Sequence, residues 1–326
     1  MSANDKNTLF IFPGQGSQYP GMGSDLYAEF AIARSVYQQA SDVLGYDVAE
    51  LSFNDPDNQL NLTRFTQPAL LTHSIACLEV FRELTGSRVQ PAMAAGHSLG
   101  EYSALVAAGA LTFDSALKAV QKRGDLMGTH GEGEMSAFPL AVDVIRPLAE
   151  HFHCAVAGCN LPEQTVVGGR SQDLELLEQA AQEQFERARS TRLKTEGAFH
   201  TYYMVKAAQL YRPVLEEAEF SPSDVRVLSN FSGGFHQDDP VDIRSRLFFQ
   251  LFHPVLWHSN LQAAFAENVD AVFEFGGGIG PASEPAGKRP NLAGMIKRVQ
   301  RASGHAAPYQ AVINLGTLEK AVESLA

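Results

Sequence analysis

The sequence predicts an α/β fold in which a large domain with a mainly parallel sheet is interrupted by a small inserted subdomain. Short apolar runs alternate with helical stretches through most of the 326 residues, an order typical of parallel sheets covered by helices. From residue 133 to residue 196 the order becomes β-α-β-β-α-β, the ferredoxin-like arrangement. We therefore predict a large domain over residues 1–131 and 198–326, and a ferredoxin-like subdomain over residues 132–197.

The elements of the large domain follow from apolar periodicity and from the residues that end each run. A buried strand is expected at residues 8–12, because this apolar run stops at Pro13 and Gly14. A further strand is expected near residues 91–95 and another at residues 271–275, which runs into a glycine-rich loop. Helices are expected near residues 31–44, 67–84, 113–127, 204–217 and 243–252.

The subdomain is predicted in the same way. Its strands are expected at residues 136–142, 154–159, 165–168 and 190–194, and its helices at residues 144–152 and 174–185. A turn around residues 160–162 joins the second strand to the third in this prediction, and glycines at both ends mark the segment as an insertion.

Composition excludes several classes of protein. With 45% hydrophobic and 19% charged residues, the chain can bury a sizeable core. Its formal net charge of -12 argues against a nucleic-acid partner, which requires a basic surface. The three cysteines lack metal-ligand spacing, so we expect reduced thiols and no metal site. No apolar run approaches the roughly 20 residues that span a bilayer, and the polar start lacks a signal pattern. We therefore expect a cytoplasmic protein without a membrane partner.

The clearest chemical motif is Gly-His-Ser-Leu-Gly at residues 96–100, between a predicted strand and a predicted helix. This G-x-S-x-G pattern is typical of the nucleophile elbow of α/β-hydrolase-like domains. The sharp turn puts the serine in strained backbone geometry, and the residues packed closely around it must be glycine. The turn also exposes the serine hydroxyl at a helix N-terminus. Ser98 is therefore the candidate nucleophile.

A serine nucleophile needs a base, and ten histidines are available. His200 lies where the large domain resumes, so it can return to the cleft, although a partly buried structural histidine is the alternative. His97 adjoins the serine but is expected to point elsewhere. No carboxylate is placed as a third member, which leaves a backbone carbonyl as a possible partner for the imidazole.

Two further features are candidates for binding. The loop at residues 14–18 is rich in glycine and could offer a main-chain N–H to an oxyanion, or hold a phosphate. On a helical wheel Arg123 falls at the rim of the buried face, where it could hold a carboxylate or extend into solvent as a surface arginine.

These motifs together resemble the malonyl-CoA:acyl-carrier-protein transacylase family and the acyltransferase domains of polyketide synthases. The matching stretches lie at residues 12–18, 66–69, 96–104, 123–124, 197–200 and 250–255, in the order of the family. The resemblance implies the same large domain and ferredoxin-like subdomain. It also implies transfer of a malonyl group from malonyl-CoA to an acyl carrier protein, with no bound cofactor.

The resemblance implies a role for each matching position. Ser98 would carry the acyl group and His200 would act as base, oriented by the backbone carbonyl of Gln250. The backbone N–H groups of Gln15 and Leu99 would form the oxyanion hole. Residues expected to contact the substrate are Arg123, which would pair with the malonyl carboxylate, and Gln67, His97, Phe199 and Asn160.

Residues 198–201 resemble malonyl-selective polyketide acyltransferases more than the fatty-acid enzyme. The tail containing residues 275–280 and 288–292 resembles free-standing acyltransferases that serve polyketide synthases in trans. The bulky Phe199 would narrow the pocket and favour unbranched malonyl. A housekeeping fatty-acid transacylase, a thioester hydrolase of the same fold and an inactive docking subunit are the alternatives. From charge alone, a basic rim for the carrier protein is expected from Arg170, Arg187, Arg189, Lys288 and Arg289.

Overall fold

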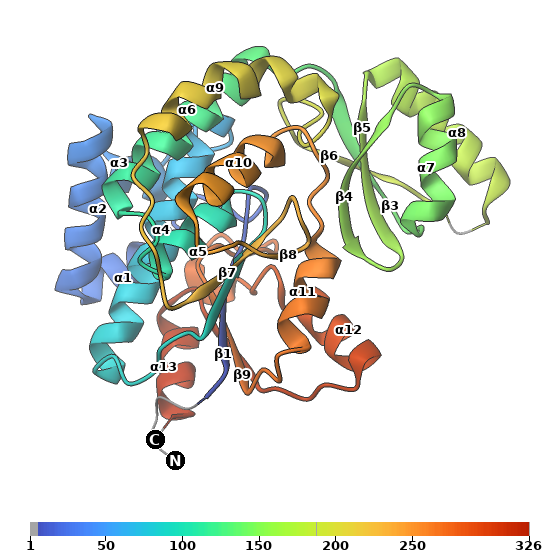
Figure 1. Cartoon of the computed structure of the whole chain (residues 1–326). Coiled ribbons are helices and arrows are strands. Elements are labelled where there is room, and N and C mark those ends of the chain that lie inside the picture. Colours follow the sequence, from blue (N-terminus) through green and yellow to red (C-terminus); the bar gives the residue numbers. More distant parts are fainter. Residues whose placement is uncertain (1–5, 187, 326) are drawn as a thin grey trace.

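Strand β1 (Thr8–Phe12) lies inside the larger of two sheets in the computed structural model, which describes residues 6–186 and 188–325 (Figure 1). The strand order of this sheet is β10-β9-β1-β2-β7-β8. Its other strands are β2 (Met93–Gly96), β7 (Arg226–Ser229), β8 (Gly234–Phe235), β9 (Ala271–Phe275) and β10 (Tyr309–Val312). All pairings are parallel except that of β7 with β8. The predicted α/β fold with a parallel sheet is confirmed.

Helices cover both faces of this sheet. Alternate residues of β1 therefore point into two different cores, one on each face. Phe10 and Phe12 join the larger core, whereas Leu9 and Ile11 join a smaller core that contains Trp257. The helices are α1 (Ser24–Glu29), α2 (Ala31–Leu44), α3 (Val48–Phe53), α4 (Thr63–Thr85), α5 (Gly100–Ala107), α6 (Phe113–His130), α9 (Val205–Glu217), α10 (Pro240–Gln250), α11 (Trp257–Phe265), α12 (Ala293–Ser303) and α13 (Leu315–Glu323), with short 3-10 helices at Tyr202–Met204 and Pro285–Gly287. Helices α11 and α12 belong to the smaller core.

The second sheet is antiparallel and stands beside the first (Figure 1). Its strands β3 (Glu134–Phe138), β4 (Ala155–Leu161), β5 (Gln164–Gly169) and β6 (Thr191–Leu193) have the order β4-β5-β3-β6. Helices α7 (Val142–His151) and α8 (Ser171–Gln184) pack on it through their own apolar core. Element order and pairing are those of the predicted ferredoxin-like subdomain.

Two predicted boundaries in this subdomain were wrong. The first strand stops at Phe138, and Val142 already begins α7. Asn160 and Leu161 belong to β4 rather than to a turn. Strand β4 runs on because Leu161 is buried in the core that contains Trp257, and it pairs with Gln164 across a two-residue loop.

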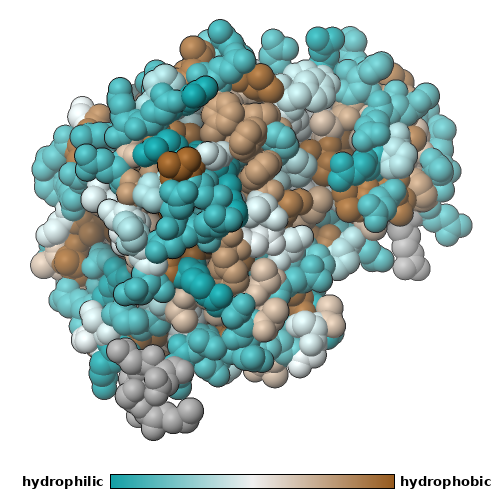
Figure 2. All heavy atoms as spheres, in the orientation of Figure 1, coloured by the Kyte–Doolittle hydropathy of each residue, from teal (hydrophilic) through white to brown (hydrophobic). Residues whose placement is uncertain are grey.

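The outside of the molecule is largely polar. The face in Figure 2 is mostly hydrophilic, with hydrophobic residues in small separate groups. No helix in the described part of the chain is long and apolar enough to cross a membrane. Cys77, Cys154 and Cys159 are all free thiols.

Candidate active site

Ser98 occupies the sharp turn between β2 and α5. Its backbone lies in the left-handed region, with φ of 53°. A Cβ atom at Gly96 would lie 1.8 Å from the carbonyl carbon of Gly100, and one at Gly100 would lie 2.2 Å from the carbonyl oxygen of Phe12. Both glycines are therefore required by the closeness of the turn, as the elbow motif predicted.

His200 is placed to take the proton of this serine. The Ser98 Oγ lies 2.7 Å from His200 Nε2, and the main-chain oxygen of Gln250 lies 2.7 Å from His200 Nδ1. A carbonyl oxygen can only accept, so Nδ1 carries the hydrogen and Nε2 presents a lone pair to the serine hydroxyl. The carbonyl partner left open by the sequence is thus present in the geometry.

The imidazole is held in its neutral form. His200 is buried, and its pKa is lowered to about 3 by burial first and by the positive charge of Arg123 second. Burial and a neighbouring cation both disfavour the imidazolium. His200 is consequently an unprotonated base at neutral pH.

Arg123 lies inside the site rather than at its rim. Arg123 is 1% exposed, because α6 packs tightly on α4, with Gly124 against the backbone of Thr63. Arg123 is therefore more deeply buried than the helical wheel indicated, and of the two placements that the wheel left open the surface arginine is wrong. One guanidinium nitrogen donates to Gln67 Oε1 at 2.9 Å. The other donates to Gln250 Oε1 at 2.9 Å and to Ser98 Oγ at 3.3 Å. No described carboxylate pairs with it within 4.0 Å.

Two residues that line the same cavity have main-chain N–H groups without an acceptor in the described part of the chain. Gln15 and Leu99 line the cavity beside Ser98. In the described part of the chain, neither of their N–H groups has a hydrogen-bond acceptor. A pair of free N–H groups near a serine nucleophile can stabilise a tetrahedral oxyanion.

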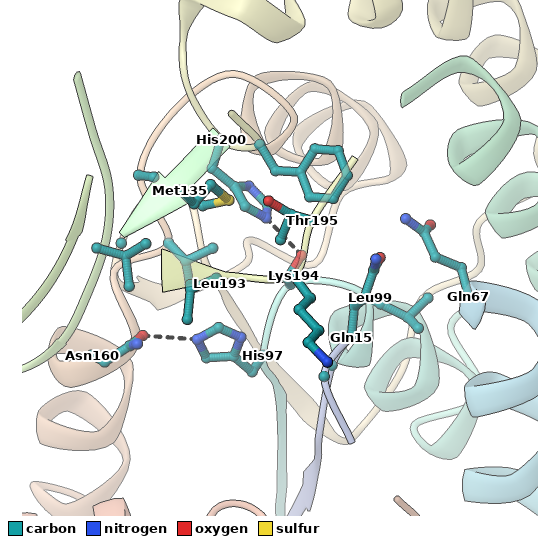
Figure 3. Close-up of a pocket in the computed structure, with 18 of the residues that line it drawn as sticks. Gln15, Gln67, His97, Leu99, Met135, Asn160, Leu193, Lys194, Thr195 and His200 are labelled. Atoms are coloured by element: carbon teal, nitrogen blue, oxygen red, sulfur yellow. Dashed lines mark hydrogen bonds between the residues drawn. The ribbon is translucent and has the colours of Figure 1, made fainter. Parts of the chain in front are cut away.

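The cavity that contains these groups measures about 820 Å³ and lies between the two sheets. The side chain of His97 points to β4, where its Nε2 donates to Asn160 Oδ1 at 2.8 Å (Figure 3). Burial lowers the pKa of His97, so this imidazole is neutral as well. Phe199 lines the wall, and Lys194 of the small subdomain extends into the opening (Figure 3). All ten predicted site residues therefore lie at or beside this cavity.

Sequence reasoning missed two buried residues behind the serine. Asn230 accepts from the main-chain N–H of Ser98 at 2.6 Å and donates to Gly96 O at 2.7 Å. Glu101 hydrogen-bonds the side chain of Gln250. Glu101 directly follows the elbow motif, which is a signal; Asn230 reaches the elbow only through the pairing of β2 with β7.

The predicted basic rim is only partly free. Arg170, Arg189 and Arg289 are exposed, and Arg187 lies outside the described residues. The ammonium of Lys288 donates to Gly280 O at 3.0 Å and lies 4.4 Å from the ring centre of Tyr19. Lys288 is thus engaged with its own chain. No group of three or more His, Cys, Asp or Glu side chains among the described residues could hold a metal ion.

Comparison with known proteins agrees with this geometry. Residues 9–274 match the family model of the acyl transferase domain. The chain is 37% identical to a malonyl CoA-acyl carrier protein transacylase of Bacillus subtilis (strain 168), over 97% of this chain and 96% of that protein. It is also 37% identical to the polyketide biosynthesis malonyl CoA-acyl carrier protein transacylase BaeC of Bacillus velezensis, over 78% of this chain and 86% of the relative.

A solved structure of a malonyl-transacylase in complex with a type II polyketide synthase acyl-carrier protein superposes with a TM-score of 0.86 and 32% identity. The match covers 98% of this chain and 100% of that one. Sequence, fold and site geometry lead to the same conclusion, which is that the chain belongs to the acyl transferase family, among the malonyl CoA-acyl carrier protein transacylases.

Proposed function

We propose that this protein transfers the malonyl group of malonyl-CoA to the phosphopantetheine thiol of an acyl carrier protein, through an ester on Ser98. The observation that carries the proposal is the buried guanidinium of Arg123, 3.3 Å from Ser98 Oγ and without a carboxylate partner among the described residues. Burial of an unpaired cation is unfavourable. A substrate with a carboxylate at its free end would supply the partner in the bidentate geometry that arginine favours.

The first half-reaction forms the ester. His200 Nε2 accepts the hydroxyl proton as Ser98 Oγ attacks the thioester carbonyl. The N–H groups of Gln15 and Leu99 donate to the oxyanion that forms. When the tetrahedral intermediate collapses, the proton on His200 goes to the departing CoA thiolate.

The second half-reaction reverses these roles. The carrier-protein thiol gives its proton to His200 and attacks the ester carbonyl, and the proton returns to Ser98 as the malonyl thioester leaves. His200, Gln15 and Leu99 act on both steps, so one site serves both substrates in turn. In this proposal the reaction needs no cofactor beyond the two substrates, and it takes place in the cytoplasm.

We place this activity with a polyketide synthase, served in trans. The residues Ala198, Phe199 and His200 support this setting, and one relative at 37% identity carries a polyketide name. Phe199 is 5% exposed and lines the cavity, so its ring restricts the space beside the malonyl group. Malonyl-CoA should therefore react faster than methylmalonyl-CoA, and equal rates would remove this part of the proposal.

A thioester hydrolase of the same fold is the competing function. Its acyl groups carry no free carboxylate, so a hydrolase would gain nothing from a buried arginine beside the serine. The partners held ready for a carboxylate, Arg123 with Gln67 and Gln250, favour transfer of malonyl groups.

The test is a chase of isolated malonyl-enzyme. The enzyme is first loaded with malonyl-CoA, freed of CoA, and mixed with phosphopantetheinylated carrier protein or with buffer alone. We expect the malonyl group to appear on the carrier protein much faster than as free malonate. Loss to water at the same rate with and without the carrier protein would establish the hydrolase instead.

A further inference from the structure

A buried carboxylate behind Ser98 takes no part in the steps above. Glu101 lies in the first turn of α5 and is 0% exposed. Its Oε2 accepts from the main-chain N–H of Asn230 at 2.9 Å and from Gln250 Nε2 at 2.8 Å. Its Oε1 lies 2.8 Å from Nε2 of His236. No described Lys or Arg pairs with it within 4.0 Å, so three N–H donors hold this carboxylate in place.

These contacts decide which way the side-chain amide of Gln250 points. A carboxylate can only accept hydrogen bonds, so the NH2 group of Gln250 must face Glu101. The same NH2 group donates to the carbonyl oxygen of Ser98 at 3.0 Å. The amide oxygen is thereby left to face Arg123, whose Nη2 nitrogen lies 2.9 Å away. With the opposite orientation, amide N–H groups would oppose guanidinium N–H groups and the bond to Arg123 would be lost.

This arrangement of hydrogen bonds leaves Arg123 free to pair with the carboxylate of a substrate. A carboxylate placed directly on Arg123 would compete with the substrate carboxylate. The amide oxygens of Gln67 and Gln250 hold the guanidinium without neutralising it. We propose that Glu101 is a positioning residue: it fixes the Gln250 amide with its oxygen toward Arg123, and so keeps the guanidinium oriented for the carboxylate of a malonyl group. This inference rests on the proposed malonyl transfer.

Glu101 also reaches the elbow itself, and the test must separate the two effects. Through Asn230 it supports the main chain at Gly96 and at the N–H of Ser98. Loosening of the elbow would slow attack on every acyl-CoA by the same factor. Misplacement of Arg123 would slow acyl groups that carry a carboxylate far more than acetyl, because only they lose a charged partner. The ratio of acylation rates with malonyl-CoA and acetyl-CoA therefore reports on how well Arg123 pairs with the malonyl carboxylate.

The experiment measures this ratio by rapid mixing and intact-protein mass for the wild type, Glu101→Met and Glu101→Gln. Methionine fills the volume but cannot accept the hydrogen bonds of Asn230, Gln250 and His236. We therefore expect the ratio to fall about tenfold or more, the effect of losing a hydrogen bond to a charged group. Glutamine can accept from Asn230 and Gln250 with its oxygen, and its amide NH2 group can donate to Nε2 of His236 when the imidazole hydrogen sits on Nδ1, which has no hydrogen-bond partner in the described chain. Glu101→Gln should therefore keep the ratio within about twofold of the wild type.

Arg123→Ala separates failure of this inference from failure of the function. If its ratio equals that of the wild type, the arginine does not select malonyl and the proposed function fails. If the Arg123→Ala ratio collapses but Glu101→Met keeps the wild-type ratio, only the positioning role is overturned. An equal loss in Glu101→Gln and Glu101→Met would also contradict the amide-orientation mechanism. If Glu101→Met does not fold, Gln250→Met is used instead, because it removes the amide that links Glu101 to Arg123. An unchanged ratio in Gln250→Met overturns the inference.

Discussion

At the scale of single residues, the two residues that meet at 2.7 Å share an unusual backbone. Ser98 and His200 both lie at positive φ, 53° and 61°, where side chains other than glycine are disfavoured by roughly 1–2 kcal/mol each. The surrounding hydrogen bonds hold them there, including that from the main-chain N–H of Ser98 to Asn230. Backbone strain is thus located at the atoms that react.

A pair of substitutions at Ser98 measures this strain. Ser98→Ala and Ser98→Gly both remove the hydroxyl, so neither should form an acyl adduct. Glycine adopts positive φ freely, so Ser98→Gly should be more stable than Ser98→Ala by about 1 kcal/mol. Denaturant unfolding of both variants checks this, and equal midpoints would show that the turn is unstrained.

After burial, the charge of Arg123 is the second cause of the lowered pKa of His200. The base works when neutral, so activity is lost as the pH falls through its pKa. With that pKa at about 3, acylation by the wild type should stay level well below the ordinary histidine value of about 6.5. Arg123→Ala removes a cation that lowers the pKa, so its acid limb should move to higher pH. Acetyl-CoA, which lacks a carboxylate, is the donor for this profile, and superimposable profiles would refute the coupling.

At the scale of elements, the elbow works because α5 starts in direct contact with β1. The backbone of Gly100 lies so near Phe12 that no side chain fits between them. This close approach places the N-terminus of α5 and the N–H of Leu99 next to the site. The glycines of the motif are therefore packing requirements as well as turn residues.

Gly100→Ala and Gly294→Ala form a matched test of this packing. The added methyl at Gly100 would meet the oxygen of Phe12 at 2.2 Å, whereas nothing lies within 4 Å of a methyl at Gly294 in α12. We expect Gly100→Ala to lower the free energy of unfolding by several kcal/mol, or to prevent folding, since the backbone cannot move aside. Gly294→Ala should be neutral or stabilising by up to about 1 kcal/mol. Thermal unfolding decides, and equal stability of the two variants would disprove the packing requirement.

Sequence patterns predicted some elements to the residue and missed others. The bounds of β1, α2 and β9 agree with prediction, because each is a distinct apolar or amphipathic run, and Gly45 in the left-handed region ends α2. Helix α4 was expected from residue 67 but begins at Thr63, with Pro68 inside it. Strands β7 and β10 have four residues each and were not predicted, since such short segments acquire strand geometry from their neighbours.

The same limit applies to the site. Ser98 and the candidate base His200 could be predicted because a motif and the return of the chain mark them. The carbonyl of Gln250 came only from resemblance, since any backbone carbonyl could have served. Glu101 and Asn230 acquire their contacts from elements far apart in the chain. The position of Glu101 directly after the elbow motif is a local signal, whereas nothing near Asn230 in the sequence marks it.

At the scale of the whole molecule, the cavity needs both units. The large unit supplies Ser98, His200 and Arg123, and the small subdomain supplies the wall that contains Met135 and Asn160. His97 crosses between them through its hydrogen bond to Asn160. Relative movement of the units would therefore alter access to the ester without moving the serine from its base.

Buried neutral histidines predict how stability depends on pH. Burial lowers the pKa of His73 to about 4, and the pKa values of His97 and His200 are lowered as well. These histidines bind a proton near pH 6.5 in the unfolded chain but stay unprotonated in the folded chain. The free energy of unfolding therefore decreases as the pH falls below about 6.5, by up to about 1.4 kcal/mol per pH unit for each histidine. Burial raises the pKa of Glu274 to about 7, so its proton binds more tightly in the folded state. Glu274 therefore offsets the pH dependence that one histidine contributes.

His73→Gln should remove one histidine from this dependence. Between pH 6.5 and about 4 its stability should fall less steeply than that of the wild type, by about 1.4 kcal/mol per pH unit. Fluorescence of Trp257, the one tryptophan of the chain and fully buried, follows unfolding. Parallel curves for the two proteins would show that His73 is protonated equally in both states.

The most direct test of the central claim is the intact-protein mass after brief mixing with malonyl-CoA and, separately, with acetyl-CoA, for the wild type and Arg123→Ala. We predict a malonyl adduct on the wild type that weakens strongly in Arg123→Ala, and little acetyl adduct on the wild type. Little malonyl adduct, with acetyl groups taken up and quickly lost to water, would contradict malonyl transfer and establish a hydrolase.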